Sequence, residues 1–150
     1  LRNWHDIPVP EIPEEHTRIA ASIIWLLKGD AGQRALMAWS FGWSPAREAS
    51  GAQWMASPLA PLLDDPYDAV RYIALRSIKR LPGYEDFDYD YLSSAEDLQK
   101  GMLQAREIWR SASQMPVNNS LLIKAPGALE QDRFERLLRN RDDTPVYLQE

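Results

Sequence analysis

The segment Pro58-Leu59-Ala60-Pro61-Leu62-Leu63-Asp64-Asp65-Pro66-Tyr67-Asp68-Ala69-Val70-Arg71-Tyr72-Ile73-Ala74-Leu75-Arg76-Ser77-Ile78 decides the fold of this chain. Apolar residues line one face of its first part, and others recur at three- and four-residue steps after the acidic proline turn. This spacing is typical of amphipathic helices. The segment therefore predicts two short helices joined at Asp65-Pro66, each of which needs a neighbour to cover its apolar face.

An earlier stretch of the chain repeats this pattern. Its apolar spacing predicts helices over 14–28 and 32–42, joined by a turn at Gly29. With an offset of about 37 residues, Arg34 aligns with Arg71, and that period is typical of helical solenoids. The sequence therefore predicts two copies of one helical unit.

The unit resembles the HEAT-repeat family in its proline-containing first helix, its Asp-Pro turn and the pair Val70-Arg71 in its second helix. The resemblance implies an all-α fold in which HEAT-like helical repeats form an α-α superhelix. It also implies structural roles for Asp65, Asp68 and Arg71. In the first unit, Asp30 and Arg34 are the expected counterparts.

We expect residues 1–150 to form a single HEAT-like helical domain and to be a fragment of a longer chain. The predicted parts are an extended, proline-containing lead-in over 1–13, two repeat units over 14–81, and a loop with a C-terminal helical extension over 82–150. Asp142 to Leu148 echoes the repeat turn, so a third unit is an open alternative there.

Three further helices and one loop are predicted within these parts. The first helix of the second unit is expected over 50–63, with Pro58 and Pro61 kinking it or lying at its ends. The extension is expected to hold helices over 94–113 and 128–140. Between them, 115–127 reads as a loop around an apolar anchor at Leu121-Leu122-Ile123.

Composition limits the classes of function. The chain is 45% hydrophobic and 26% charged, as soluble globular domains are, and its longest apolar stretch is shorter than the roughly 20 residues of a membrane span. A net charge of -5 disfavours nucleic acid as a partner. Without Cys, the chain has no disulfide, no thiolate nucleophile and no Cys-x-x-Cys-His haem attachment motif.

We predict no catalytic residue, no cofactor and no metal site. Asp64, Asp65 and Asp68 fit a metal or acid-pair reading less well than the capping of a helix start. His5 and His16 are the two histidines, and their spacing matches no metal-binding motif.

Aromatic residues supply the predicted contacts with a partner. Acidic and aromatic residues alternate from Tyr84 to Tyr91. This pattern fits recognition of a basic protein surface, and it fits equally a solvated loop pinned by two of its rings. Trp25, Trp39 and Trp109 are expected to pack in the core. The predicted partner-contact residues are Trp43, Trp54, Tyr84, Phe87 and Tyr89.

These features favour a protein-interaction or scaffold module without catalysis of its own, which binds a protein or another domain of the same chain. An alternative is an accessory domain of an exported multihaem c-type cytochrome-like protein, because 18–27, 30–43 and 65–78 look similar to helical-repeat regions of such bacterial chains. That resemblance implies a periplasmic or otherwise exported location, and without it a cytoplasmic one is expected.

A second alternative is a HEAT-like DNA glycosylase, a class that uses Trp and an acid in a basic groove. The positive face it needs would come from Arg71, Arg76, Lys79 and Arg80. The oligomeric state is left open.

Overall fold

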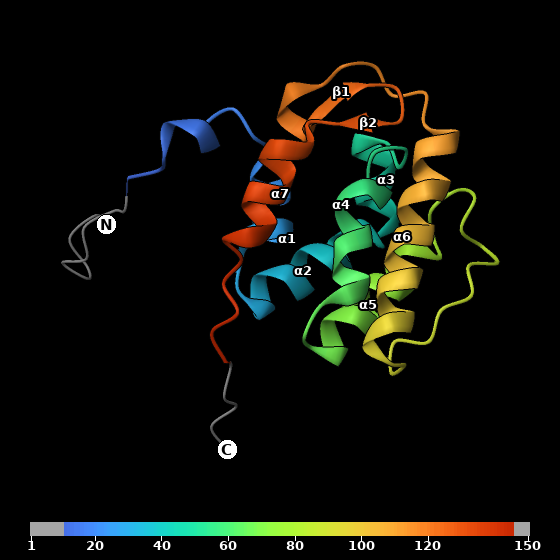
Figure 1. The fold of residues 1–150 in the computed structure, drawn as a ribbon. Coiled ribbons are helices and arrows are strands. Elements are labelled where there is room, and N and C mark those ends of the chain that lie inside the picture. Colours follow the sequence, from blue (N-terminus) through green and yellow to red (C-terminus); the bar gives the residue numbers. More distant parts are fainter. Residues whose placement is uncertain (1–10, 146–150) are drawn as a thin grey trace.

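The computed structural model describes residues 11–145 and shows a mostly helical chain with one small two-stranded sheet (Figure 1). This confirms the largely all-α prediction. His5, most of the lead-in and the end of the possible third unit lie outside the described residues. The α-helices are α1 (Ala21–Lys28), α2 (Ala31–Phe41), α3 (Ser44–Ser50), α4 (Ala56–Leu59), α5 (Asp68–Ile78), α6 (Ala95–Ala112) and α7 (Gln131–Arg139). The shorter elements are the 3-10 helices η1 (Glu14–His16), η2 (Ala60–Asp64) and η3 (Asn119–Leu121), and the strands β1 (Ile123–Ala125) and β2 (Ala128–Leu129).

The helices form two rows that share one core. The first row consists, in order, of α7, α1, the consecutive helices α4 and η2, and α6. Each of these contacts the next. The second row is α2 beside α5, which lie below the first row in Figure 1. Contacts of α1 with α2 and of η2 with α5 join the rows. The two predicted helix pairs are thus neighbours in space.

Small side chains allow α2 and α5 to approach closely. Ala38 and Ala74 are fully buried, and the Ser77 hydroxyl donates to the Ala38 carbonyl at 2.6 Å. A Cβ on Gly42 would lie 2.5 Å from Ser77 Oγ, so only a glycine fits where α2 ends. This close contact fixes how α2 is rotated about its own axis.

Local capping explains where several helices begin. Before α2, Asp30 Oδ1 accepts from the Gln33 amide at 2.8 Å, and the Gln33 side chain accepts from the Asp30 amide. This reciprocal pair is a capping box. Ser94 similarly accepts from the Asp97 amide and begins α6, whose bounds lie within a residue of the predicted ones.

The predicted helix over 14–28 is interrupted. It is η1 followed by α1, because the Ala20 amide donates to the Ser120 carbonyl at 2.9 Å instead of to a carbonyl in a preceding turn. No side chain caps the start of α1. A tertiary contact with a segment one hundred residues away thus breaks the helix.

The predicted helix over 50–63 is also wrong as a single element. Gly51 has φ of 74°, which ends α3 and separates it from α4. Pro58 lies in the first turn of α4, and Pro61 lies in the first turn of η2, where a missing amide costs no intrahelical bond. Pro45 likewise lies in the first turn of α3.

The expected loop over 115–127 contains a hairpin that the sequence did not predict. The apolar anchor is confirmed, since Leu122 and Ile123 are fully buried. β1 pairs antiparallel with β2, and Gly127 takes φ of 66° in the turn between them. Residues 128 and 129 belong to this hairpin, so α7 begins at Gln131 instead of 128.

We expect Gly42→Ala to lower the free energy of unfolding by about 1–3 kcal/mol, the usual cost of overpacking a close contact. The backbone of Gly42 is in the ordinary right-handed region, so the loss would come from the clash with Ser77. Urea unfolding followed by circular dichroism measures it. The control is Gly32→Ala in the first turn of the same helix, where a Cβ would lie 3.3 Å from the Asp30 carboxylate and so crowd its neighbour less; it should cost less stability than Gly42→Ala, and equal losses in both variants would contradict the packing argument.

Candidate functional site

Two apolar stripes run along α2, and only one of them is buried. Ala31, Ala38 and Phe41 face the core, whereas the second stripe is exposed to solvent. The exposed fractions of its side chains are 54% for Leu36, 56% for Trp39 and 51% for Trp43. Trp39 was predicted to pack in the core, and that prediction is wrong because the contact with α5 turns Leu36 and Trp39 outward.

The exposed tryptophans support each other. The rings of Trp39 and Trp43 stack with centroids 6.3 Å apart and an interplanar angle of 16°. On α5, Tyr72 is 42% exposed, its ring lies 5.1 Å from that of Tyr91, and the Arg76 guanidinium lies 5.8 Å from its centroid. We call Leu36, Trp39 and Trp43 the aromatic face.

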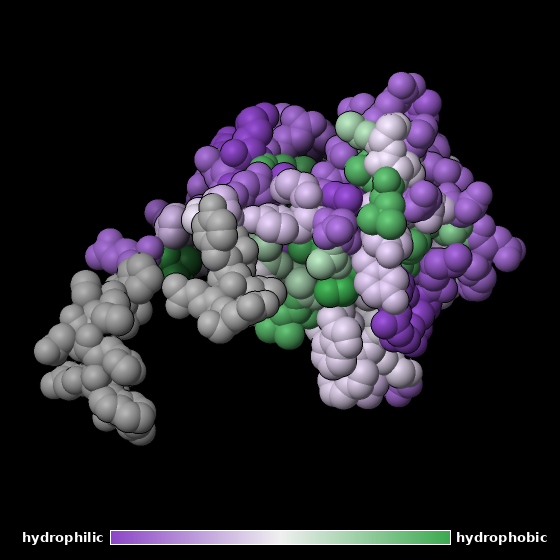
Figure 2. Space-filling model, turned by 90° about the horizontal axis from the view of Figure 1, so that it is seen from below, coloured by the Kyte–Doolittle hydropathy of each residue, from purple (hydrophilic) through white to green (hydrophobic). Residues whose placement is uncertain are grey.

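Basic residues adjoin this face at the C-terminal ends of α2 and α5. Arg80 donates to the Gly42 carbonyl at 3.0 Å, and Arg47 donates to the Arg80 carbonyl at 2.7 Å, which places both beside Trp43. Lys79 and Arg76 are exposed on α5. These four residues are the basic group. Figure 2 shows the molecule from the α2–α5 side, where green and pale side chains gather with purple ones around them.

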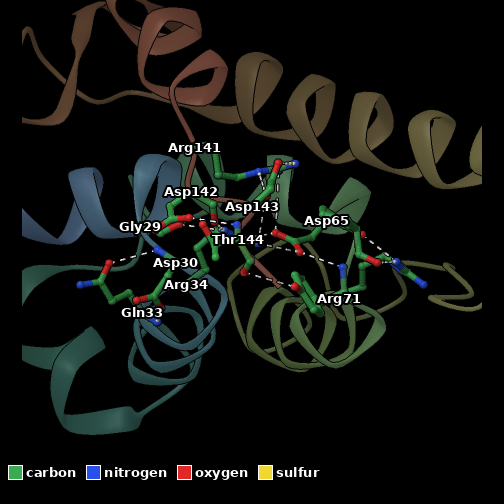
Figure 3. Close-up of polar contacts among 12 residues, drawn as sticks. Gly29, Asp30, Gln33, Arg34, Asp65, Arg71, Arg141, Asp142, Asp143 and Thr144 are labelled. Atoms are coloured by element: carbon green, nitrogen blue, oxygen red, sulfur yellow. Dashed lines mark hydrogen bonds and ion pairs between the residues drawn. The ribbon is translucent and has the colours of Figure 1, made fainter. Parts of the chain in front are cut away.

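A buried ion pair lies behind the aromatic face (Figure 3). Arg34 has no exposed surface, and its guanidinium donates to both Asp65 carboxylate oxygens, at 2.7 Å and 3.2 Å. Its Nη1 donates to the Gly29 carbonyl at 2.7 Å and to the Asp142 carbonyl at 2.8 Å. The carboxylate of Asp143 lies 3.4 Å from Nη2. One arginine of the first helix pair therefore binds the turns of both pairs and the segment after α7.

Asp65 and Arg71, predicted to be structural, lie in this same cluster. Asp65 Oδ1 accepts from the Tyr67 amide at 3.0 Å and so shapes the turn into α5. Arg71 donates to the carbonyls of Asp65, Pro66 and Tyr91, at 2.6, 3.2 and 2.7 Å, and contacts no carboxylate at ion-pair distance among the described residues.

The other two predicted acids lie outside the ion pair. Asp68 is exposed and its Oδ1 accepts from the Ala69 amide at 2.8 Å at the start of α5. Asp30 caps α2 through Gln33, and Arg34, the expected first-unit counterpart of Arg71, binds Asp65 of the neighbouring helix pair.

Residues 141–144 were missed as part of this cluster. The Asp142 amide donates to the Lys28 carbonyl at 3.0 Å, and Arg141 lies 3.8 Å from the Asp65 carboxylate. The similarity of Asp142-Asp143-Thr144-Pro145 to the turn at Asp65 was the sequence feature that pointed here. The three turns meet around Arg34.

Three predicted partner-contact residues have buried side chains and are corrected as surface residues. Trp54, Tyr84 and Phe87 are 7%, 3% and 4% exposed. Trp54 packs edge-on against Phe41 with centroids 5.0 Å apart, and the Tyr84 hydroxyl donates to the Ala105 carbonyl at 2.8 Å. The loop over 82–94 is thus anchored by its rings, and its acids point outward.

The side chain of Tyr89, another predicted contact residue, is neither fully buried nor largely exposed. It is half-buried, stacks on Phe87 with centroids 6.1 Å apart, and donates its hydroxyl to the Leu63 carbonyl. A Cβ on Gly101 of α6 would collide with its ring. Burial raises the pKa of Tyr89 to about 12 and raises the pKa of Tyr84 further still. Of the five predicted contact residues, Trp43 is the one with a largely exposed side chain.

Of the tryptophans that were expected in the core, one is buried and the others are exposed. Trp109 is buried and its indole donates to the Gln53 carbonyl at 2.9 Å, which confirms that prediction. Trp25 is 41% exposed on α1, so its predicted burial is wrong. It lies outside the α2–α5 row.

Within residues 11–145, no group of three His, Cys, Asp or Glu side chains is placed to hold a metal ion. No helix in that range has the length and apolar content to cross a membrane. Comparison with protein-family models, curated proteins and solved structures found no match.

We expect Asp65→Asn to lower the free energy of unfolding by about 3–5 kcal/mol, because it removes the buried counter-ion of Arg34 and leaves only the half-exposed carboxylate of Asp143, at 3.4 Å. Urea unfolding measures the loss. Asp68→Asn removes an exposed acid from the same turn and should cost less than about 1 kcal/mol. Similar stability of the two variants would show that the buried pair does not hold the fold.

The raised pKa of Tyr89 predicts a loss of stability at alkaline pH. The folded chain keeps this proton up to about pH 12, whereas an unfolded tyrosine loses it near its ordinary pKa of about 10. Because the unfolded state binds fewer protons in that interval, the free energy of unfolding falls from pH 10 to 12. Tyr89→Phe should reduce this fall, measured by urea unfolding at each pH, whereas the exposed control Tyr72→Phe should not.

Proposed function

We propose that this chain is a protein-interaction module with no catalysis of its own, and that it docks a partner segment on the aromatic face. The observation that carries the proposal is the stacked pair of Trp39, on α2, and Trp43, between α2 and α3, each more than half exposed beside a helix whose other apolar stripe fills the core. Large exposed apolar side chains that lie together are a common mark of a binding surface. Tryptophan is also enriched among residues that dominate binding energy.

The proposed architecture is that of two HEAT-like repeat units, α1–α2 and α4–η2–α5. Its support is the offset of about 37 residues together with the parallel placement of α2 and α5 in one row. At that offset Arg76 occupies the position of Trp39, so both lie on the outer side of the row. A row of second helices would give a partner one continuous surface.

The charges next to the face define the partner. Arg47, Arg76, Lys79 and Arg80 lie at one end of it, and Arg80 is held beside Trp43 through the Gly42 carbonyl. The proposed occupant is a protein segment with apolar or aromatic side chains followed by acidic ones. It belongs either to a separate protein or to another domain of the same polypeptide, such as a redox domain in a multihaem cytochrome-like parent.

Selection from a displayed library of random peptides tests the proposal. Wild-type protein should enrich peptides that combine apolar with acidic residues. In the double variant Trp39→Ala with Trp43→Ala, the enriched peptides should bind at least about tenfold more weakly, in line with the usual cost of about 2 kcal/mol or more for truncating a central tryptophan. Fluorescence anisotropy measures the affinities.

Trp25→Ala is the matched control, since it removes an exposed tryptophan from α1 and leaves the aromatic face intact. Peptides that bind wild type and the double variant equally well would overturn the proposal. So would tight, salt-sensitive binding of a DNA duplex lost in Arg76→Gln and Lys79→Gln, which would favour the glycosylase-like alternative.

A further inference from the structure

A cavity of about 320 Å³ lies between α6, the β1–β2 hairpin and α7, in the row opposite the aromatic face. Its lining includes Arg106 and Arg110 of α6, Lys124 of β1, and Gln131 at the start of α7. Trp109 forms part of its wall. Three cationic side chains from two elements thus line one small cavity.

No carboxylate is among the described residues that line this cavity. Arg106 donates to Gln131 Oε1 at 3.3 Å and lies over the Phe134 ring at 5.9 Å. Neither Arg106 nor Lys124 has a carboxylate at ion-pair distance within residues 11–145, and Arg110 has Glu107 at 3.4 Å on the exposed side of α6. Glu130 and Asp132 line an adjoining hollow, which also includes Lys124.

The positive charges in the cavity are poorly compensated. Burial lowers the pKa of Arg106, and the nearby charge of Arg110 lowers it further, with Glu135 acting in the opposite direction. A bound anion would reduce both the cost of burying the Arg106 charge and its repulsion from Arg110. It would do so because it replaces the lost hydration and neutralises the like charges.

Packing holds the cavity walls in place without a ligand. A Cβ on Gly127 would lie 2.3 Å from the Arg110 carbonyl oxygen, so the hairpin turn rests directly on α6. Next to Lys124, Ile123 is fully buried, which anchors β1. The indole of Trp109 is fixed through its bond to Gln53. The three cations therefore extend from rigid elements.

We propose that this cavity binds the phosphate group of a small phosphomonoester. Two guanidinium groups and an ammonium match the charge and the several acceptor oxygens of a phosphate dianion better than those of a carboxylate. The cavity volume admits the phosphate with a small substituent against the wall that Trp109 forms. This site is independent of the proposed partner surface.

Isothermal titration calorimetry with phenyl phosphate, inorganic phosphate and benzoate tests the site. Both phosphates should bind more tightly than benzoate, and a tighter phenyl phosphate would identify the organic ester as the preferred source. Arg106→Gln and Lys124→Gln should each weaken phosphate binding by about tenfold, since a charge-assisted hydrogen bond is lost in each.

Lys100→Gln is the control, because Lys100 is an exposed cation on α6 paired with Glu96 at 2.8 Å, away from the cavity. It should bind phosphate as wild type does. If circular dichroism shows that Arg106→Gln does not fold, the affinity of Lys124→Gln for phosphate tests the proposal instead. Lys124 is exposed at the rim of the cavity, so its replacement should not disturb folding. Absence of phosphate binding at millimolar concentrations, or equal weakening in Lys100→Gln, would overturn the proposal.

Discussion

The buried pair Arg34–Asp65 is the interaction on which the arrangement of the helices depends. A guanidinium without exposed surface loses its hydration, and this loss is compensated only because its donors meet a carboxylate and two carbonyl groups. A lysine in this position would present one ammonium instead of a planar fork and could not hold these acceptors in the same geometry. The pair thereby fixes three turns of the backbone, distant in sequence, around one side chain.

The position of those turns determines which side of α2 meets solvent. With the turns before α2 and α5 held together, the two helices run side by side, and the small residues Ala38, Ala74 and Ser77 settle between them. Ala38 faces inward, so Leu36 and Trp39 face outward. The ion pair and the close contact of two helices therefore create the aromatic face, although neither contributes a side chain to it.

Sequence patterns predicted the two helix pairs and the Asp-Pro turn, and they assigned structural roles to Asp65 and Arg71. These predictions were possible because periodicity and turn chemistry are local properties of the chain. They did not choose between the two stripes of α2, since both repeat at helical spacing and the choice depends on the contact of Ala38 with Ser77 of α5, 39 residues away. The prediction of partner contacts in the acidic aromatic loop over 82–94 was wrong for a related reason. Tyr84 and Phe87 turn inward between outward acids, an alternation that requires the long helix α6 as a support. The hairpin at 123–129 was not predicted, because its strands have too few residues to show an alternating pattern.

Net charge is a weak guide to the ligands of this chain. Acids outnumber bases by 22 to 17, yet the basic group near the aromatic face and the cations of the α6–hairpin cavity are local concentrations of positive charge. At physiological ionic strength a charge is screened beyond about 8 Å, so a bound anion responds to the cations beside it and hardly to distant acids. Within residues 11–145, Arg106 and Lys124 also form no ion pair, whereas Lys100 on α6 pairs with Glu96 and Asp97. An acidic protein can therefore present two separate concentrations of positive charge. Arg76, Lys79 and Arg80 lie close together in the sequence and were predicted as a positive face, whereas the cavity brings Arg106 and Arg110 together with Lys124 from a separate segment that only the fold places beside them.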